Sequence, residues 1–281
     1  MKKHCISIAI LIVFCFSIQA FTESPGAKGK RVSIEQDTQP KFQRVKANII
    51  LKIYGSDGRQ KFAKKLVMAQ YTKNLGKWNE IESSITYFKS PADDRGNAFL
   101  AYNYKNREDA KYVYLKGIRK AKKVAGASKK TSFFGSDFFT NDMGIPDVKE
   151  WTYRYLGPKK VKFKGRNFTT MAVLCTAVNP NELGYSKKVV YMYKASRKSY
   201  LTLMIKYYDL NKSLFKIMRL KSFLVRKNIK GQRVFYTTGL EMKNVQRGTR
   251  TELLIKNIKP ENKSGVKPHI FTVQYLSKRW W

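Results

Sequence analysis

The sequence predicts a mainly β protein built from one antiparallel sheet or barrel. Strand-like runs recur roughly every 10–15 residues with little between them, which is typical of antiparallel all-β folds. Amphipathic helical periodicity is nearly absent. The 281 residues are 43% hydrophobic and 14% aromatic, enough apolar material for a packed core. No change in composition divides the chain, so we expect a single β domain over residues 42–281.

The first segment of the chain resembles an export signal. Lys2 and Lys3 form a basic start, residues 6–18 are apolar, and Ala20 ends a plausible cleavage site. The apolar run is too short for an ordinary membrane span. We therefore expect residues 1–20 to be a signal peptide and the exported, soluble chain to begin near Phe21.

Cysteine usage agrees with a simple exported domain. Cys5 and Cys15 lie in the predicted signal peptide, which leaves Cys175 and excludes an intramolecular disulfide. Cys175 lies in the apolar run 169–178, so a buried structural thiol is favoured over a nucleophile. A lipid anchor on Cys15 is disfavoured because residues 12–14 lack the small side chains of such sites.

Each remaining element is predicted from its local pattern. Residues 21–41 are polar and contain Pro and Gly, which predicts a flexible lead-in. Residues 42–54 alternate, with Val45 and Ile49 on one face, as in a half-buried strand, and a Gly-rich turn at 55–58 follows. Further strands are expected at 59–74, 75–89, 99–104, 111–115, 118–124, 151–156, 167–178, 189–194, 200–208, 214–225, 233–240 and 249–258. We expect a short helix at 136–144, a chain turn at Gly157-Pro158, and a strand or helical turn at 270–276.

The net charge of +38, from 57 basic and 19 acidic residues, has two interpretations. Lysine could simply coat every surface, or the charge could attract membrane headgroups, acidic glycolipid or nucleic acid. The run 118–124 has four basic residues, which are our candidates for binding an anionic partner: Arg119, Lys120, Lys122 and Lys123. Lysine on an edge strand also discourages aggregation, which is the structural alternative.

The segment 133–139 is the most unusual in the sequence. Two phenylalanine pairs flank Gly135, which allows a sharp turn, and Ser136 or Asp137 could cap the helix that follows. The segment either plugs a core or forms an aromatic lip beside an apolar cavity. On the second interpretation the ligand-cavity candidates are Phe133, Phe134, Phe138, Phe139 and Trp151.

Residues suited to catalysis are sparse. After signal removal one histidine remains, His269, in a Gly/Pro/Lys loop where a surface position is expected. There is no phosphate-binding or dinucleotide fingerprint. The carboxylate pairs Asp93-Asp94 and Asp137/Asp142 lie where turns or helix starts are expected, which favours turn and cap roles over acid–base work. We therefore expect no enzyme activity, no metal and no cofactor.

An ordered series of motifs resembles the LolA-like outer-membrane lipoprotein-sorting family. It comprises Ser90-Pro91-Ala92-Asp93-x-Arg95-Gly96, Tyr114-Leu115 with Arg119, Ser132-Phe133-x-Gly135-Ser136-Asp137-Phe138, Tyr153-Arg154-Tyr155-Leu156-Gly157, Tyr207-Tyr208-Asp209 with Phe215-Lys216, and Met242-Lys243-Asn244 with Arg250-Thr251-Glu252-Leu253. The resemblance covers about Phe42 to Leu276. The sequence departs from the family in its basic charge and in residues 24–43, which lack the amphipathic pattern of the family's N-terminal helix.

The resemblance implies a LolA/LolB-like fold: a curved antiparallel sheet forming an incomplete barrel, with short covering helices around an apolar cavity. It also implies a periplasmic carrier for acyl chains of lipids or lipoproteins, and some similar proteins accompany RND-type exporters. The alternative function is an adaptor that carries nothing and docks on an RND-type exporter or an anionic membrane surface. A nucleic-acid partner would suit the charge and aromatics, but the export signal argues against it.

Overall fold

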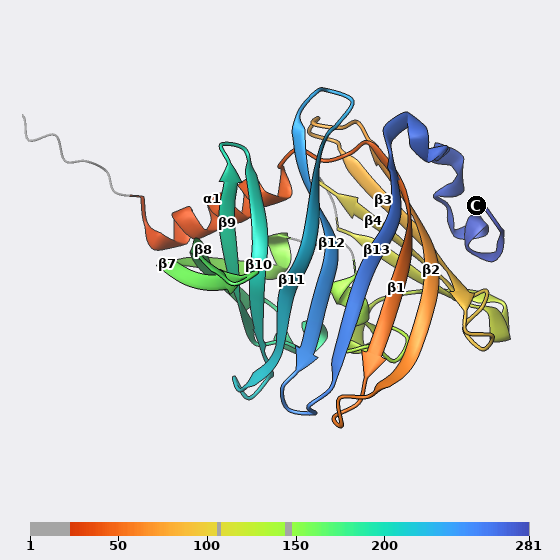
Figure 1. Ribbon diagram of the computed structural model, residues 1–281, viewed down its shortest axis with the longest axis horizontal. Coiled ribbons are helices and arrows are strands. Elements are labelled where there is room, and N and C mark those ends of the chain that lie inside the picture. The colour runs from red at the N-terminus through yellow and green to blue at the C-terminus, as the bar shows by residue number, and fades with distance from the viewer. Residues whose placement is uncertain (1–22, 106–107, 144–147, 281) are drawn as a thin grey trace, which may run out of the picture.

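One antiparallel sheet of thirteen strands forms the framework of the molecule and curves around its interior (Figure 1). The computed structural model describes residues 23–105, 108–143 and 148–280. The predicted signal peptide at residues 1–20 lies outside them. The sheet confirms the predicted mainly β, antiparallel fold. Within the described residues, the helices lack the length and apolar character needed to cross a membrane.

The elements are as follows. The strands are β1 Arg44–Tyr54, β2 Gln60–Lys73, β3 Ile81–Ser90, β4 Ala98–Tyr104, β5 Ala110–Leu115, β6 Lys120–Lys123, β7 Trp151–Phe163, β8 Arg166–Ala177, β9 Lys187–Ser196, β10 Ser199–Tyr208, β11 Leu214–Lys227, β12 Arg233–Asn244 and β13 Arg250–Pro260. The helices are α1 Pro25–Asp37 and α2 Pro180–Leu183, with 3-10 turns η1 Lys116–Ile118, η2 Gly126–Lys130, η3 Thr140–Asp142, η4 Val148–Glu150, η5 Glu261–Ser264, η6 Pro268–Ile270 and η7 Val273–Ser277.

The order of the strands explains why one segment must cross the interior. Strands β1 to β6 follow each other outward to one edge, and β7 to β13 return from the other edge until β13 pairs with β1. The chain therefore passes from edge strand β6 to edge strand β7 through residues 124–150. Phe133 and Phe138 of this crossing segment belong to the same core cluster as the inner residues of β1.

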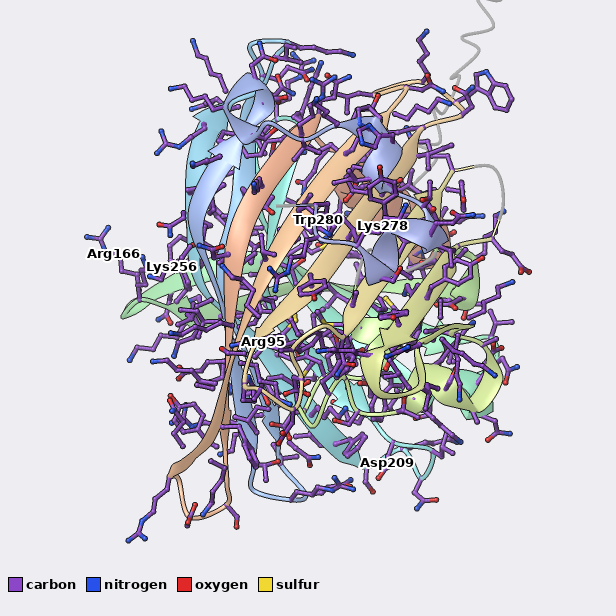
Figure 2. The ribbon with its side chains drawn as sticks, turned by 90° about the vertical axis from the view of Figure 1, so that its right-hand side faces the viewer. Arg95, Arg166, Asp209, Lys256, Lys278 and Trp280 are labelled. Carbon is purple, nitrogen blue, oxygen red and sulfur yellow. The ribbon has the colours of Figure 1, made fainter. Side chains whose placement is uncertain are left out.

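The core is largest on the inner, concave face of the sheet. Strand β1 alternates strictly between buried and half-buried residues, as its sequence predicts, and Val45 and Ile49 face inward. The C-terminal turns η6 and η7 cover the opposite, outer face of β2–β4, where Phe271 and Leu276 belong to the same buried cluster as Leu100. Figure 2 shows Lys278 and Trp280 in this segment lying over the strands.

Residues 25–37 form a helix, so the predicted flexible lead-in at 21–41 is wrong over this range. The Ser24 hydroxyl accepts a hydrogen bond from the Ala27 amide, which caps the helix start. Gly29 brings the helix close to the backbone of β7, where an added Cβ would lie 2.9 Å from the Tyr155 nitrogen. The helix needs no wide apolar stripe, because close backbone contact and the buried side chain of Val32 hold it on the sheet. Its sequence therefore shows little apolar periodicity.

Three local predictions also need correction. Of the helix expected at 136–144, the described part contains only the turn Thr140–Asp142; residue 144 lies outside it. Gly157-Pro158 does not turn the chain, because β7 continues through a bulge in which Gly157 has a φ of +86°. The segment 75–89 becomes a strand only from Ile81. For 270–276, where a strand or a helical turn was expected, the helical turn is confirmed.

Candidate ligand cavity

A cavity of about 500 Å³ lies between the concave face, α1 and the crossing segment. This volume falls within the range of about 300–1,000 Å³ that holds a single small ligand. Every strand from β1 to β4 and from β7 to β13 contributes to its lining, and so does α1. The cavity is therefore built by tertiary packing of most of the fold.

An apolar band crosses the cavity wall. The strand registers place Val173, Val190, Ile205 and Met218 side by side on β8, β9, β10 and β11. The last three of these side chains line the cavity, together with Ile49, Met68 and Leu253 from the other half of the sheet. Two methionines in this wall add flexible, polarizable surface that can adapt to an irregular apolar ligand.

A polar row lies directly beside the apolar band, two residues later on β8 and β10 and two residues earlier on the antiparallel strands β9 and β11. Register pairs join Tyr153 of β7 to Cys175, Cys175 to Lys188, Lys188 to Tyr207, and Tyr207 to Lys216. The first four of these residues line the cavity. One end of the cavity is therefore polar, and we call this line of five side chains the polar row.

Lys188 is the charged member of the polar row that lines the cavity. Its side chain is 6% exposed, and its ammonium lies 3.8 Å from the ring centroid of Trp151. Burial lowers the pKa of Lys188, although the neighbouring Cys175 and Asp142 act in the opposite direction. The electron-rich face of an indole stabilises a cation that has lost most of its water.

The thiol in the polar row is inert. Cys175 is buried, has no disulfide partner, and burial raises its pKa to about 11. A neutral thiol in an apolar strand is a weak nucleophile. The predicted structural role for this cysteine agrees with its position.

An ion cluster shortly after α1 lies at another part of the cavity lining, which includes Lys41 and Glu82. The Lys41 ammonium lies 2.9 Å from a Glu82 carboxylate oxygen and 3.2 Å from a Glu80 oxygen. Burial acts to lower the pKa of Lys41, but these two carboxylates outweigh it and raise that pKa. The Tyr236 hydroxyl donates to the Gln70 side chain at 2.8 Å nearby. The cation in this part of the lining is therefore already paired.

Helix α1 is held over the cavity by side-chain hydrogen bonds to β10. Gln36 donates to the Thr202 hydroxyl at 2.6 Å, and the Tyr200 hydroxyl donates to the Glu35 carboxylate at 2.5 Å. Gln36 and Thr202 themselves line the cavity. The helix that sequence patterns failed to predict thus covers the candidate site.

Of the five predicted cavity residues, two line the cavity and three pack elsewhere. Phe138 and Trp151 line the cavity. Phe133 is buried and packs edge-on against Phe99, while Phe134 lies on Phe88 with ring centroids 4.2 Å apart. The fifth residue, Phe139, stacks on Tyr185 at 4.9 Å. The segment therefore serves both as a core plug and as a cavity wall.

The turn in this segment has the predicted glycine but a different anchor. Gly135 has a φ of +79°, and Phe134 before it is also left-handed at +49°. The Asp137 carboxylate does not cap a helix, contrary to expectation. It accepts hydrogen bonds from the Thr249 and Thr251 hydroxyls at 2.5 and 2.8 Å, which ties the crossing segment to β13.

The four basic candidates lie apart from the cavity. Lys120, Lys122 and Lys123 belong to edge strand β6, all of whose residues are exposed, and Arg119 precedes it in the exposed turn. None of the four lines the cavity. Positive charge is not confined to this edge, since Arg166 and Lys256 project from the start of β8 and from β13 (Figure 2).

Sequence reasoning missed Lys188 and Lys216, although a signal was present. Lys188 shares its alternation phase with Val190 and Met192, so its side chain belongs to the buried face of β9. Lys216 likewise shares its phase with Met218. Lysine at an inward position of an otherwise apolar strand face marks a buried charge.

Comparison with solved structures defines the class of this fold as LolA-like. A DUF1329 family protein from Desulfovibrio piger aligns with a TM-score of 0.74 at 23% identity, over 90% of this chain and 100% of that chain. A Vibrio parahaemolyticus domain, named for outer-membrane lipoprotein sorting, gives 0.72 at 20%, over 89% and 99%. A LolA superfamily protein from Nitrosomonas europaea gives 0.60 at 14%, over 88% and 99%.

A match to a protein-family model shows the family of this chain. A family model whose description is "Uncharacterized protein" matches residues 80–278, and this chain belongs to that family. No curated protein matches the sequence. The resemblance to LolA-like proteins predicted from sequence motifs is confirmed at the level of the fold.

Proposed function

We propose that this chain is a periplasmic carrier that binds an acyl chain of a lipid or lipoprotein in the cavity and delivers it toward the outer membrane. The observation that supports this most directly is the apolar band of Val190, Ile205 and Met218 in the wall of a cavity of about 500 Å³. The LolA-like fold and the export signal predicted at residues 1–20 support the same role. In this proposal the β domain over residues 42–281 acts as one unit, covered by α1.

The driving force for such a carrier is burial of the chain. Each CH₂ group moved from water into an apolar cavity contributes about 0.8 kcal/mol. A carrier of this kind needs no bound nucleotide, metal or catalytic group, because transfer depends on the difference in burial between donor, cavity and acceptor. Met218 and Met68 would let one cavity fit chains of different shape.

The test has two parts. Native mass spectrometry of protein purified from its own host should detect a bound acylated molecule. Delipidated protein should then bind a fluorescent fatty-acyl probe at micromolar concentration. Met218→Trp, which fills the cavity, should abolish binding, whereas Val225→Trp at an exposed position of the same strand should not. Absence of probe binding by the folded wild-type protein would refute the carrier proposal.

The exposed basic edge supports a second candidate, a non-carrying adaptor of an RND-type exporter or an anionic membrane surface. Strand β6 leaves its outer backbone groups unpaired within the sheet and carries three lysines. Cross-linking in cells should trap an inner-membrane exporter even when the cavity is filled by Met218→Trp. The double variant Lys120→Glu, Lys122→Glu should abolish this cross-link. If cavity-filling variants lose all function, the adaptor proposal fails.

A further inference from the structure

We propose that the Lys188 ammonium and the Trp151 indole N–H bind the anionic head group of a single-chain amphiphile, a carboxylate or a phosphate monoester. The inference rests on the carrier function proposed above and deepens it. It states which end of the cavity holds the head group and which class of ligand the cavity prefers.

Both donors are buried, line the cavity and lack an acceptor. Trp151 is 7% exposed and Lys188 is 6% exposed. The indole Nε1 of Trp151 has no hydrogen-bond partner among the described residues. Among the described residues, no carboxylate lies within ion-pair distance of Lys188. Its ammonium instead contacts the face of the Trp151 ring. A buried donor left unsatisfied is destabilising, so both groups favour an incoming acceptor.

The nearby acids accept hydrogen bonds or pair with other groups, and none of them forms an ion pair with Lys188 among the described residues. Asp142 accepts hydrogen bonds from the Phe139 amide at 2.7 Å and from the Tyr185 hydroxyl at 2.9 Å. Glu150 lies 3.1 Å from the Lys129 ammonium. The remaining neighbour, Cys175, is neutral because burial raises its pKa to about 11. An anion arriving from outside would therefore supply the directly contacting counter-charge that Lys188 lacks.

The surroundings fit an amphiphile better than a free anion. Val190 follows Lys188 by two residues on the same face of β9, and Ile205 and Met218 continue the apolar band beside it. A head group at Lys188 places the tail along this band toward α1. The volume of about 500 Å³ suits one small ligand, which favours a single chain over a multiply acylated lipid.

The cation at the other part of the cavity lining provides the contrast. Lys41 lines the cavity too, but it already has Glu80 and Glu82 as partners. Only one of the two lysines in the described lining is thus available to an incoming anion. This asymmetry gives the ligand a direction in the cavity.

The experiment compares three probes of equal chain length on the delipidated full chain: lauric acid, lauryl phosphate and lauryl alcohol. A charge-assisted hydrogen bond of about 1.5–3 kcal/mol predicts that the wild-type protein binds at least one anionic probe about tenfold or more tightly than the alcohol. Lys188→Met should lose this preference and keep alcohol binding. The matched control, Lys187→Met on the opposite face of β9, should retain the preference.

The outcomes separate the two proposals. Equal affinity of wild-type protein for acid, phosphate and alcohol overturns the head-group site but leaves the carrier function standing, whereas failure to bind all three refutes the carrier itself. If Lys188→Met fails to fold, Trp151→Phe removes the indole N–H and keeps a ring for Lys188. That variant should reduce the preference, and an unchanged preference overturns the assignment. The tighter anionic probe identifies the head group as carboxylate or phosphate.

Discussion

The Lys216 ammonium lies 3.3 Å from the ring centroid of Phe139, almost buried beneath the crossing segment. It also lies 3.3 Å from the Tyr185 hydroxyl, which donates to Asp142. The ring of Phe139 therefore makes a cation–π contact with the buried ammonium of Lys216. This contact explains why an aromatic residue expected at the cavity is held outside it.

Lys216 should make stability depend on pH. Burial lowers its pKa to about 8, although Asp142 and Asp137 act in the opposite direction. A lysine in the unfolded chain has a pKa of about 10.4. Between these values the unfolded state binds more protons, so the contribution of Lys216 to the free energy of unfolding increases as pH rises.

Urea unfolding of the wild-type protein and Lys216→Met measures this contribution. The wild-type free energy of unfolding, relative to the variant, should rise by ~2 kcal/mol between about pH 7 and about pH 9.5. Other titrating groups cancel in the difference. A difference that stays constant over this range would show that Lys216 keeps an ordinary pKa.

Gly29 should control the docking of α1. A Cβ at this position would meet the Tyr155 backbone nitrogen at 2.9 Å and Arg154 backbone atoms at 3.0 and 3.1 Å, so Gly29→Ala must push the helix away from β7. Amide hydrogen exchange in residues 25–37 should accelerate in this variant. The matched control is Gly26→Ala, whose Cβ would have an ordinary contact of 3.6 Å. Equal exchange in both variants would mean that the helix does not depend on this close approach.

The Asp137 carboxylate should anchor the crossing segment to β13 through Thr249 and Thr251. Hydrogen bonds to a charged group contribute about 1.5–3 kcal/mol, so Asp137→Ala should lower the free energy of unfolding by at least this amount. Asp93→Ala, at an exposed turn position, should change it by less than about 0.5 kcal/mol. Chemical denaturation of the two variants provides the comparison, and similar midpoints would exclude the anchor.

Cys175 should react slowly with thiol reagents in the folded protein. Its pKa of about 11 lies two units above the ordinary value of 9.0, which reduces the reactive thiolate about 100-fold at neutral pH. A chain starting at residue 21 contains this cysteine alone, so labelling kinetics can be read directly. Labelling in urea supplies the unfolded reference. Comparable rates in both states would show that the cavity wall opens freely.

Phe133 and Phe138 should differ in their effect on ligand binding. Both are buried, so each change to alanine should cost about 3–5 kcal/mol of stability. Phe138 lines the cavity and Phe133 does not, so only Phe138→Ala should also change affinity for an acyl probe. Titration of the two variants under folding conditions tests this, and equal affinities would place the cavity wall elsewhere.

Most strands could be predicted from the sequence, because side-chain alternation is a local property of an extended chain. The pattern of Val45 and Ile49 on β1 appears unchanged in the structure, and so does the exposed basic edge at Lys120–Lys123. The motif series around Ser136 and Asp137 was enough to identify the LolA-like class, which the fold confirms.

The cavity that these elements form could not be predicted from the sequence, because it depends on contacts between distant segments. Helix α1 depends on contact between Gly29 and β7, which no local pattern records. The phenylalanines of 133–139 separate because Phe88, Tyr185 and Lys216 approach them from distant strands. The juxtaposition of Lys188 with Trp151 requires the registers of β7, β8 and β9, since cross-strand neighbours are set by pairing rather than by sequence distance.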